Sequence, residues 1–172
     1  MTNLRVQSID DKHIRISGIA SVLAVMLREM PEILEMRDAP DARERLFPKP
    51  TRANDKINKE WQQMIGPELR HLFVSAGETL TRDLTALTAD QEDAEAYQVE
   101  FPIEHVRAWM SALNQARLIL GEIHQIEETD MNRADLNPQD PRHLAALRIH
   151  LLGYVLQSFV ELEIGDEPKD SI

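Results

Sequence analysis

Apolar residues recur at helical spacing in five long stretches of this chain, and this pattern limits the possible folds more than any other feature of the sequence. Side chains three or four positions apart share one face of an α-helix, and an apolar face must be buried against another element. The stretches are residues 19–30, 51–65, 67–87, 102–126 and 141–162. The sequence therefore predicts a mainly α fold, a helical bundle of four to five helices.

The N-terminal residues follow a different pattern. Residues 4–16 alternate between apolar and polar side chains, and the polar residues 10–12 in their middle favour a turn. This pattern predicts a small β-hairpin, which must pack on the bundle because an isolated hairpin is not stable in water. We expect a single domain over residues 1–164 and a flexible tail over residues 165–172.

Three connecting stretches lack a sustained apolar stripe. Residues 37–50 contain three prolines among charged residues, which favours an ordered loop or linker. Residues 88–100 are acidic with little apolar content, and we expect a mobile loop or a short exposed helix there. Residues 127–140 are again acidic and are predicted to be irregular.

The charge of the chain is acidic and unevenly distributed. There are 19 Lys and Arg against 30 Asp and Glu, a net charge of −11, which argues against nucleic acid as a partner because its phosphates need clustered cations. Residues 43–59 nevertheless carry six basic and two acidic side chains, a local excess of four. This basic segment either complements the acidic part of the same molecule or binds an anionic partner.

Two further absences narrow the function. The chain has no cysteine, which excludes disulfides, thiolate metal sites and cysteine nucleophiles. The apolar run at residues 149–160 has twelve residues, fewer than the ~20 needed to span a bilayer. No signal peptide is evident, so we expect a cytoplasmic protein that does not bind membranes.

The sequence contains no pattern typical of catalysis. Glu68 and His71 have the Glu-x-x-His spacing of carboxylate-bridged di-iron bundles, but such a site needs the motif twice and it occurs once. Neither a glycine-rich phosphate loop nor a Gly-x-Ser-x-Gly motif is present. We therefore predict no catalytic residues, no metal site and no cofactor.

A seam of polar side chains runs through two otherwise apolar predicted helices. The polar residues recur three or four positions apart, which places them on one face of each helix. They are Asn114, Arg117, His150, Tyr154, Gln157 and Glu161. If the helices pack antiparallel, Arg117 could meet Gln157 or Glu161. The seam is then either a hydrogen-bonded network that fixes helix register or a small pocket in which Arg117 anchors an anion.

One short segment is a candidate for contact with other proteins. Arg45, Leu46, Phe47 and Pro48 place two large apolar side chains between charged stretches. Apolar anchors surrounded by charge are typical of protein interaction surfaces. We therefore treat these four residues as interaction candidates.

The chain resembles a bacterial family catalogued as a domain of unknown function, serial number two-zero-one-seven. The likeness rests on a strand-then-helix N-terminus and three motifs, namely Arg45-Leu46-Phe47-Pro48, the stretch ALNQARLILG at residues 112–121 and LQSFVE at residues 156–161. Their order and spacing cover most of residues 4–163. Many members are encoded beside the adaptor of the Clp protease, so the resemblance implies an association with regulated proteolysis. It implies no catalytic residues.

Two hypotheses about function follow. The first is a non-enzymatic helical domain that acts through contacts with a protein partner, whose identity the sequence does not give, with regulated proteolysis as the implied setting. The alternative is a bundle that binds a small ligand or an anion along the polar seam around Arg117. The many apolar stripes also make a homodimer through an amphipathic helix a reasonable expectation.

Overall fold

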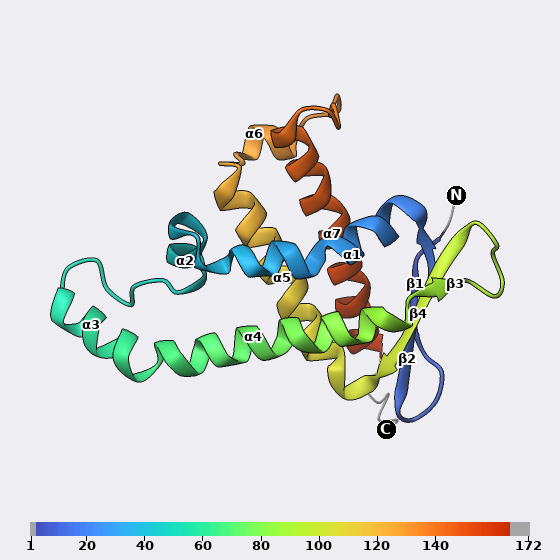
Figure 1. Cartoon of the computed structure of the whole chain (residues 1–172), viewed down its shortest axis with the longest axis horizontal. Helices are drawn as coiled ribbons and strands as arrows, with labels where there is room; N and C mark the ends of the chain where they lie inside the picture. The colour runs from blue at the N-terminus through green and yellow to red at the C-terminus, as the bar shows by residue number, and fades with distance from the viewer. Residues whose placement is uncertain (1–2, 166–172) are drawn as a thin grey trace, which may run out of the picture.

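Helices pack against one face of a small sheet in the computed structural model, which describes residues 3–165 (Figure 1). The helices are α1 (Ser21–Glu35), α2 (Pro40–Leu46), α3 (Asp55–Met64), α4 (Gly66–Asp83), α5 (Val106–Ile123), α6 (Glu128–Met131) and α7 (Pro141–Gly165). The strands are β1 (Arg5–Ser8), β2 (His13–Ala20), β3 (Thr88–Ala89) and β4 (Ala96–Pro102). Three single 3₁₀ turns, η1 (Met36–Asp38), η2 (Leu84–Ala86) and η3 (Ile103–His105), complete the described chain.

The mainly α fold is confirmed, but the expected number of helices was too low. Seven α-helices are present in residues 3–165, against the predicted four to five. The additional ones, α2 and α6, are short and lie in stretches predicted to be loops. Pro40 occupies the start of α2, where its missing N–H and fixed φ are compatible with a helix, so the prolines of residues 37–50 do not exclude one.

The N-terminal hairpin is confirmed, and it belongs to a larger sheet. β1 pairs antiparallel with β2, with Val6 opposite Ile16, and the carboxylate of Asp10 accepts hydrogen bonds from the backbone of Lys12 and His13 in the turn. The strand order is β1-β2-β4-β3, antiparallel throughout. The sheet thus extends beyond residues 4–16 to strands about eighty positions further along the chain.

The expectation of a mobile loop or exposed helix over residues 88–100 is wrong. These residues contain β3 and most of β4, and β4 pairs with the whole length of β2. Val99 is 1% exposed and Phe101 is 2% exposed, so β4 contributes to the core. The sequence feature that indicates β4 is the recurrence of Tyr97, Val99 and Phe101 at every second position, which is the period of a strand.

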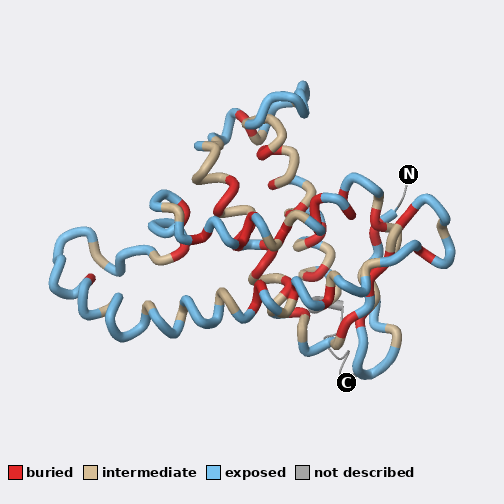
Figure 2. The backbone as a smooth tube through the Cα atoms, in the orientation of Figure 1, coloured by how far each residue is buried: buried red, intermediate tan, exposed pale blue. Residues whose placement is uncertain are grey.

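The hydrophobic core lies where the central helix α5 meets the sheet and its neighbouring helices (Figure 2). The rings of Phe101 on β4 and Trp109 on α5 stack with centroids 4.5 Å apart, and Phe159 on α7 lies 6.1 Å from Trp109. The helix at the centre is α5, whereas Tyr154 on α7 is half exposed.

One end of the molecule extends beyond this core. α3 and the first half of α4 project from the body, and Figure 2 shows their backbone as mostly exposed. We call residues 55–72 the arm. At the other end of the chain, the predicted flexible tail lies outside the described residues except for Gly165, which is the last residue of α7.

Candidate functional site

Local polar contacts order the start of the arm and the loop before it. The side chain of Asn54 caps α3 by accepting hydrogen bonds from the backbone of Lys56 and Ile57. Asn58 is the buried residue of α3, and it donates to the Thr51 carbonyl at 2.9 Å while accepting from the Thr51 N–H at 3.2 Å. A loop-to-helix clamp therefore holds α3, and no apolar side chain of α3 is buried.

An apolar stripe runs along the arm without being covered. Trp61 is half-buried, whereas Ile57 is 48%, Met64 75% and Leu72 58% exposed. Positions 57, 61 and 64 lie on one face of α3 because their spacings are close to whole turns, and Leu72 lies on the following helix α4. An amphipathic helix normally buries such a face, so this one is available for a contact outside the described chain.

A pocket of about 520 Å³ opens between α2 and the arm. Its apolar walls come from Pro40, Phe47, Trp61 and Pro67. Phe47 is fixed by an edge-on contact with the ring of Phe73 on α4, at a centroid distance of 5.5 Å. The pocket is therefore a preformed concave site with aromatic walls.

The charged rim of this pocket is mixed, with more cations than anions. Arg43, Lys49 and Arg70 stand against Asp38 and Glu44. Arg70 donates two hydrogen bonds to Asp38, at 2.5 and 2.9 Å, and this pairing holds the pKa of the Asp38 carboxyl below its usual range. Arg43 and Lys49 form no ion pair with any described residue, so two cations remain for an anionic partner.

The four interaction candidates from the sequence occupy different environments. Leu46 is 4% exposed and belongs to the core, while Phe47 lines the pocket. Arg45 lies 3.7 Å from Glu122 on α5, and Pro48 is exposed. Phe47 is thus the member of this segment that the structure presents at the pocket, and the arm residues were not among the sequence candidates.

The polar seam is brought together only in part. α5 and α7 pack antiparallel, but Arg117 lies over Gly153, where a Cβ would be 3.3 Å from Arg117 Nε. Arg117 forms no hydrogen bond with Gln157 or Glu161, both of which are exposed. The absence of a side chain at Gly153 therefore makes room for the guanidinium.

A second cavity, of about 670 Å³, lies beside this part of the seam. Asn114 and Arg117 line it, and the buried Nε of Arg117 has no partner among the described residues. His150 instead bonds to the Met131 carbonyl at 2.9 Å, and Tyr154 is half exposed outside the cavity. Two of the six seam candidates thus share a cavity, and the other four do not line it.

A buried carboxylate that sequence reasoning missed joins three elements. Asp83 at the end of α4 accepts from Trp109 Nε1 at 2.8 Å and lies 2.9 Å from His105 Nδ1. A carboxylate that orients a histidine is also found in hydrolase triads, but no hydroxyl group among the described residues is hydrogen-bonded to His105. The residues are more than twenty positions apart, so no local pattern indicated their contact.

A family model described as "Domain of unknown function (DUF2017)" matches residues 11–162. The chain belongs to this family. Searches of curated proteins and of solved structures returned no match. The matched residues of this DUF2017 protein include the arm, its pocket and the polar seam.

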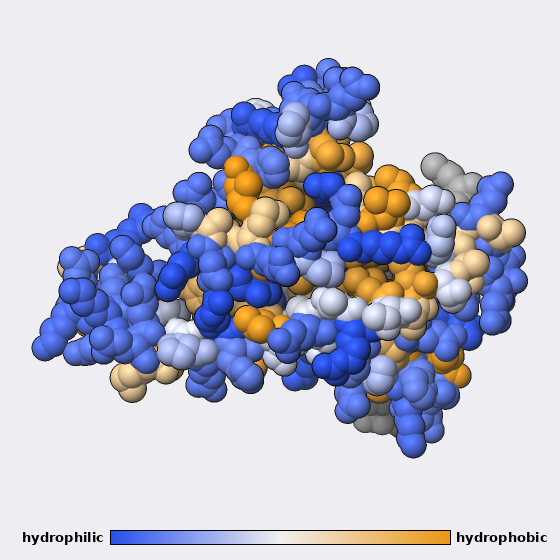
Figure 3. Space-filling view, in the orientation of Figure 1, coloured by the Kyte–Doolittle hydropathy of each residue, from blue (hydrophilic) through white to orange (hydrophobic). Residues whose placement is uncertain are grey.

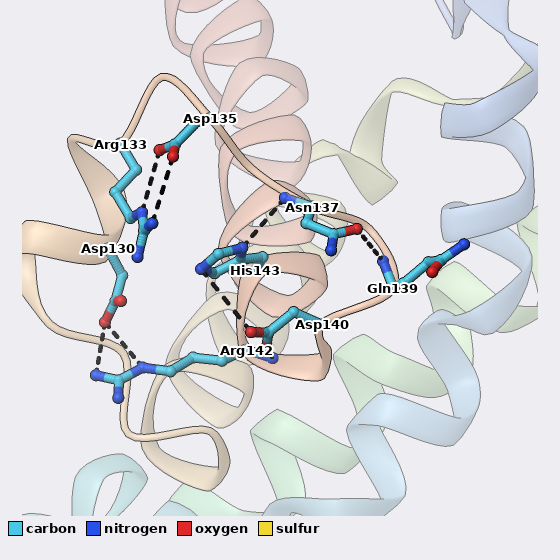
Figure 4. A network of polar contacts seen from close by, with 8 residues as sticks. All are labelled: Asp130, Arg133, Asp135, Asn137, Gln139, Asp140, Arg142 and His143. Carbon is cyan, nitrogen blue, oxygen red and sulfur yellow. Dashed lines mark hydrogen bonds and ion pairs between the residues drawn. The ribbon is translucent and has the colours of Figure 1, made fainter.

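The acidic stretch at residues 127–140 of this DUF2017 protein is an ordered polar network (Figure 4). Asp130 is 7% exposed and accepts hydrogen bonds from Arg142 at 2.7 and 3.0 Å and from the Glu127 backbone at 2.9 Å. The backbone bond and Arg142 lower the pKa of the Asp130 carboxyl. Much of this acidity therefore serves to connect α6 to α7.

The described residues of this DUF2017 protein offer no site for a metal ion, since no three His, Asp or Glu side chains lie close enough together. Glu68 and His71, the one Glu-x-x-His pair, are both exposed on the arm. None of the described helices is long and apolar enough to cross a membrane.

Proposed function

We propose that this protein is a docking module, and that the arm with its pocket binds an acidic segment of a partner protein through apolar anchors. The observation that carries the proposal is the uncovered apolar face of α3. Ile57 and Met64 remain about half or more exposed, although Asn58 holds the same helix against the loop before it. An ordered helix that presents apolar side chains to solvent is typical of a binding surface.

Charge complementarity supports an acidic occupant. Residues 43–59 carry an excess of four positive charges in a chain whose net charge is −11, so the rest of the chain sums to −15. Figure 3 shows that the outer end formed by α3 is mostly hydrophilic, so its apolar side chains stand within a polar surface. An acidic peptide with one or two large apolar residues matches both properties.

A selection from a random peptide library on the purified protein tests this proposal. Enriched peptides should combine Asp or Glu with aromatic or large aliphatic residues. Their affinity, measured by fluorescence anisotropy, should fall about tenfold or more in Trp61→Ala and in Met64→Glu, because anchors in apolar pockets dominate binding energy. The matched control is Val25→Glu, since Val25 is a similarly exposed apolar residue on α1 (51%) outside the arm.

Three results would contradict the proposal. These are the absence of enriched peptides, enrichment of basic peptides, or binding that Met64→Glu leaves unchanged. Sedimentation of the same variants tests the homodimer expected from sequence. If the wild type is a dimer that Met64→Glu converts to a monomer, the occupant of the arm is a second copy of this chain and not a partner peptide.

Regulated proteolysis is the setting we propose for this docking activity, because the resemblance is to a family of which many members are encoded beside the Clp protease adaptor. Purified adaptor is therefore the first natural protein to test. We expect it to bind the wild type and Val25→Glu but not Met64→Glu. If the adaptor binds none of these proteins, the proposed link to regulated proteolysis is wrong. The peptide experiment would still test whether the arm is a binding surface.

A second candidate function rests on the unpartnered Nε of Arg117. The cavity beside it also contains Arg45, Asp41, Glu122 and Glu127, so its lining carries both signs of charge. A zwitterion such as an amino acid fits this lining better than a simple anion. Thermal unfolding with a panel of amino acids tests the idea: a stabilising ligand should lose its effect in Arg117→Leu.

The double variant Arg117→Leu with Gln157→Leu distinguishes a pocket from a structural network. If it folds normally and retains every ligand response of the wild type, the seam is not a binding site. Because Gln157 lies outside the cavity, we expect the Arg117 substitution alone to account for any loss.

A further inference from the structure

A separate hollow is lined by the second half of α1, by η1 and by α4. It has a volume of about 450 Å³, which is within the size range of small-molecule sites. Pro31, Leu34 and Val74 supply apolar walls. Arg37 on η1 closes one side, and we call this hollow the Arg37 groove.

Arg37 is an unusual side chain for such a position. It is 8% exposed, its Nε is buried without a hydrogen-bond partner, and its guanidinium forms no ion pair within residues 3–165. Burial, together with the nearby charge of Arg70, lowers the pKa of Arg37. A buried cation without a bonded anion is costly, so the groove lacks a partner for this group.

The fold makes room for this guanidinium, and the carboxylate adjacent to it in sequence is already paired. At Gly77 on α4, a Cβ would lie 3.2 Å from Arg37 Nη2 and 3.2 Å from Leu34 Cδ1. Asp38 is adjacent in sequence, but both of its oxygens accept hydrogen bonds from Arg70. Glu35 and Glu78 also line the groove, but neither forms an ion pair with Arg37, so the guanidinium remains open to an anion from outside the described chain.

Two features of the lining define the charge of that anion. Arg37 and Arg82 are balanced by Glu35 and Glu78, so the groove is close to neutral and disfavours a dianion such as phosphate. The hydroxyl groups of nearby Thr81 and Thr85 already donate to backbone carbonyls at 2.8 and 2.7 Å. Recognition of the anion is thus left to the guanidinium groups.

We propose that the Arg37 groove binds a small organic monocarboxylate, with the carboxylate on Arg37 and its hydrocarbon part against Pro31, Leu34 and Val74. A planar guanidinium pairs with a carboxylate through two parallel hydrogen bonds. The lining of this groove is separate from that of the pocket against α2, and the two sites are linked through Arg70 of the arm, which holds Asp38.

Titration followed by NMR tests the proposal on the wild-type protein. The Nε–H signal of Arg37 should shift and saturate with phenylacetate, shift little with the neutral phenylacetamide, and require at least about tenfold more inorganic phosphate. Equal responses to all three compounds, or no saturable response to phenylacetate, would overturn the proposal. A phenylalanine-ending peptide that binds much more tightly than phenylacetate, and only as its free acid, would assign the groove to a protein C-terminus and overturn it as well.

Variants supply the second readout, through backbone amide signals of α4. Arg37→Met should abolish the phenylacetate response, and Arg37→Lys should weaken it about tenfold because an ammonium lacks the two-bond geometry. Gly77→Ala keeps the charge but presses on Nη2, and should also weaken binding. The matched control is Arg52→Met, on the exposed loop before α3, which should bind as the wild type does. An unchanged response in Arg37→Met would disprove the assignment.

Discussion

The indole Nε1 of Trp109 donates a 2.8 Å hydrogen bond to the carboxylate of Asp83, and this bond fixes the end of α4 against the start of α5. Trp109 is fully buried and Asp83 is 9% exposed, so water cannot replace either partner. The same carboxylate lies 2.9 Å from His105 Nδ1. One acidic side chain thereby satisfies two groups at the most aromatic part of the core.

Asp83→Ala should therefore lower the free energy of unfolding by about 2–3 kcal/mol, since it leaves a buried indole N–H without an acceptor. For a domain of this size the corresponding fall in Tm is roughly 5–10 °C, which differential scanning calorimetry would detect. Asp83→Asn keeps an acceptor, so its Tm should lie between those of the wild type and Asp83→Ala. Glu104→Gln, at an exposed neighbouring position, is the control, and a loss as large as that of Asp83→Ala there would contradict the argument.

Gly18 is a position where the backbone conformation does not tolerate another residue. Its φ is +65°, the register of β2 against β4 shifts between Ile16 and Ile19, and a Cβ would lie 2.3 Å from the Asn3 carbonyl oxygen. Gly18→Ala should cost at least about 2 kcal/mol, through both the left-handed backbone and the clash.

Gly66→Ala is the matched control for that substitution. A Cβ at Gly66 would meet nothing within 4 Å, and the residue begins α4. Alanine should leave stability unchanged or raise it by up to about 1 kcal/mol, because it reduces the freedom of the unfolded chain. Urea unfolding of both variants measures the difference, and equal losses would show that local geometry does not explain Gly18.

Helical periodicity was sufficient to predict the long helices but not the sheet. The stripes of α1, α4, α5 and α7 are long enough for their period to be read, as is the alternation that predicts the hairpin. β4 was missed because its acidic flank obscured the alternation of Val99 with Phe101. Short helices such as α6 depend on local capping, which a hydrophobic pattern does not detect.

The candidate sites show a similar division. Sequence placed Arg117 on the correct face of α5, because helix spacing determines the face, but it could not indicate that Gly153 would lie opposite. Asp83 with Trp109, and Arg37 with Gly77, are contacts between distant parts of the chain. The exposure of Met64 depends on how the arm leaves the body, which no single helix encodes.

The buried carboxylates of Asp90 and Asp130 should make the free energy of unfolding dependent on pH in the acidic range. Backbone N–H groups of Gly18 and Glu92 lower the pKa of Asp90, and the Glu127 N–H and Arg142 lower that of Asp130. A carboxyl whose folded pKa is lowered stabilises the protein above its ordinary value of 3.8, and this contribution is lost as the pH falls further.

The midpoint of urea unfolding should therefore decline as the pH drops below about 4, and decline less steeply in Asp90→Asn with Asp130→Asn. Asp11→Asn, which removes an exposed carboxylate in the hairpin turn, should follow the wild-type curve. A double variant whose curve has the wild-type slope would mean that other groups cause the acid sensitivity.

The arginines at positions 117 and 142 should respond in opposite ways to replacement by leucine. Arg142 donates hydrogen bonds to the Asp130 carboxylate and to the Gln125 carbonyl. Arg142→Leu should therefore lower Tm, because both acceptors lose their donor. Arg117 has a buried Nε without a partner, so Arg117→Leu should be neutral or stabilising by up to about 2 kcal/mol. The two substitutions therefore distinguish a role in stability from a role in ligand binding. Of these two arginines, Arg117 contributes less to stability and is the one expected to bind a ligand. If Arg117→Leu lowers Tm as much as Arg142→Leu does, its charge stabilises the fold and the cavity beside it is not a binding site.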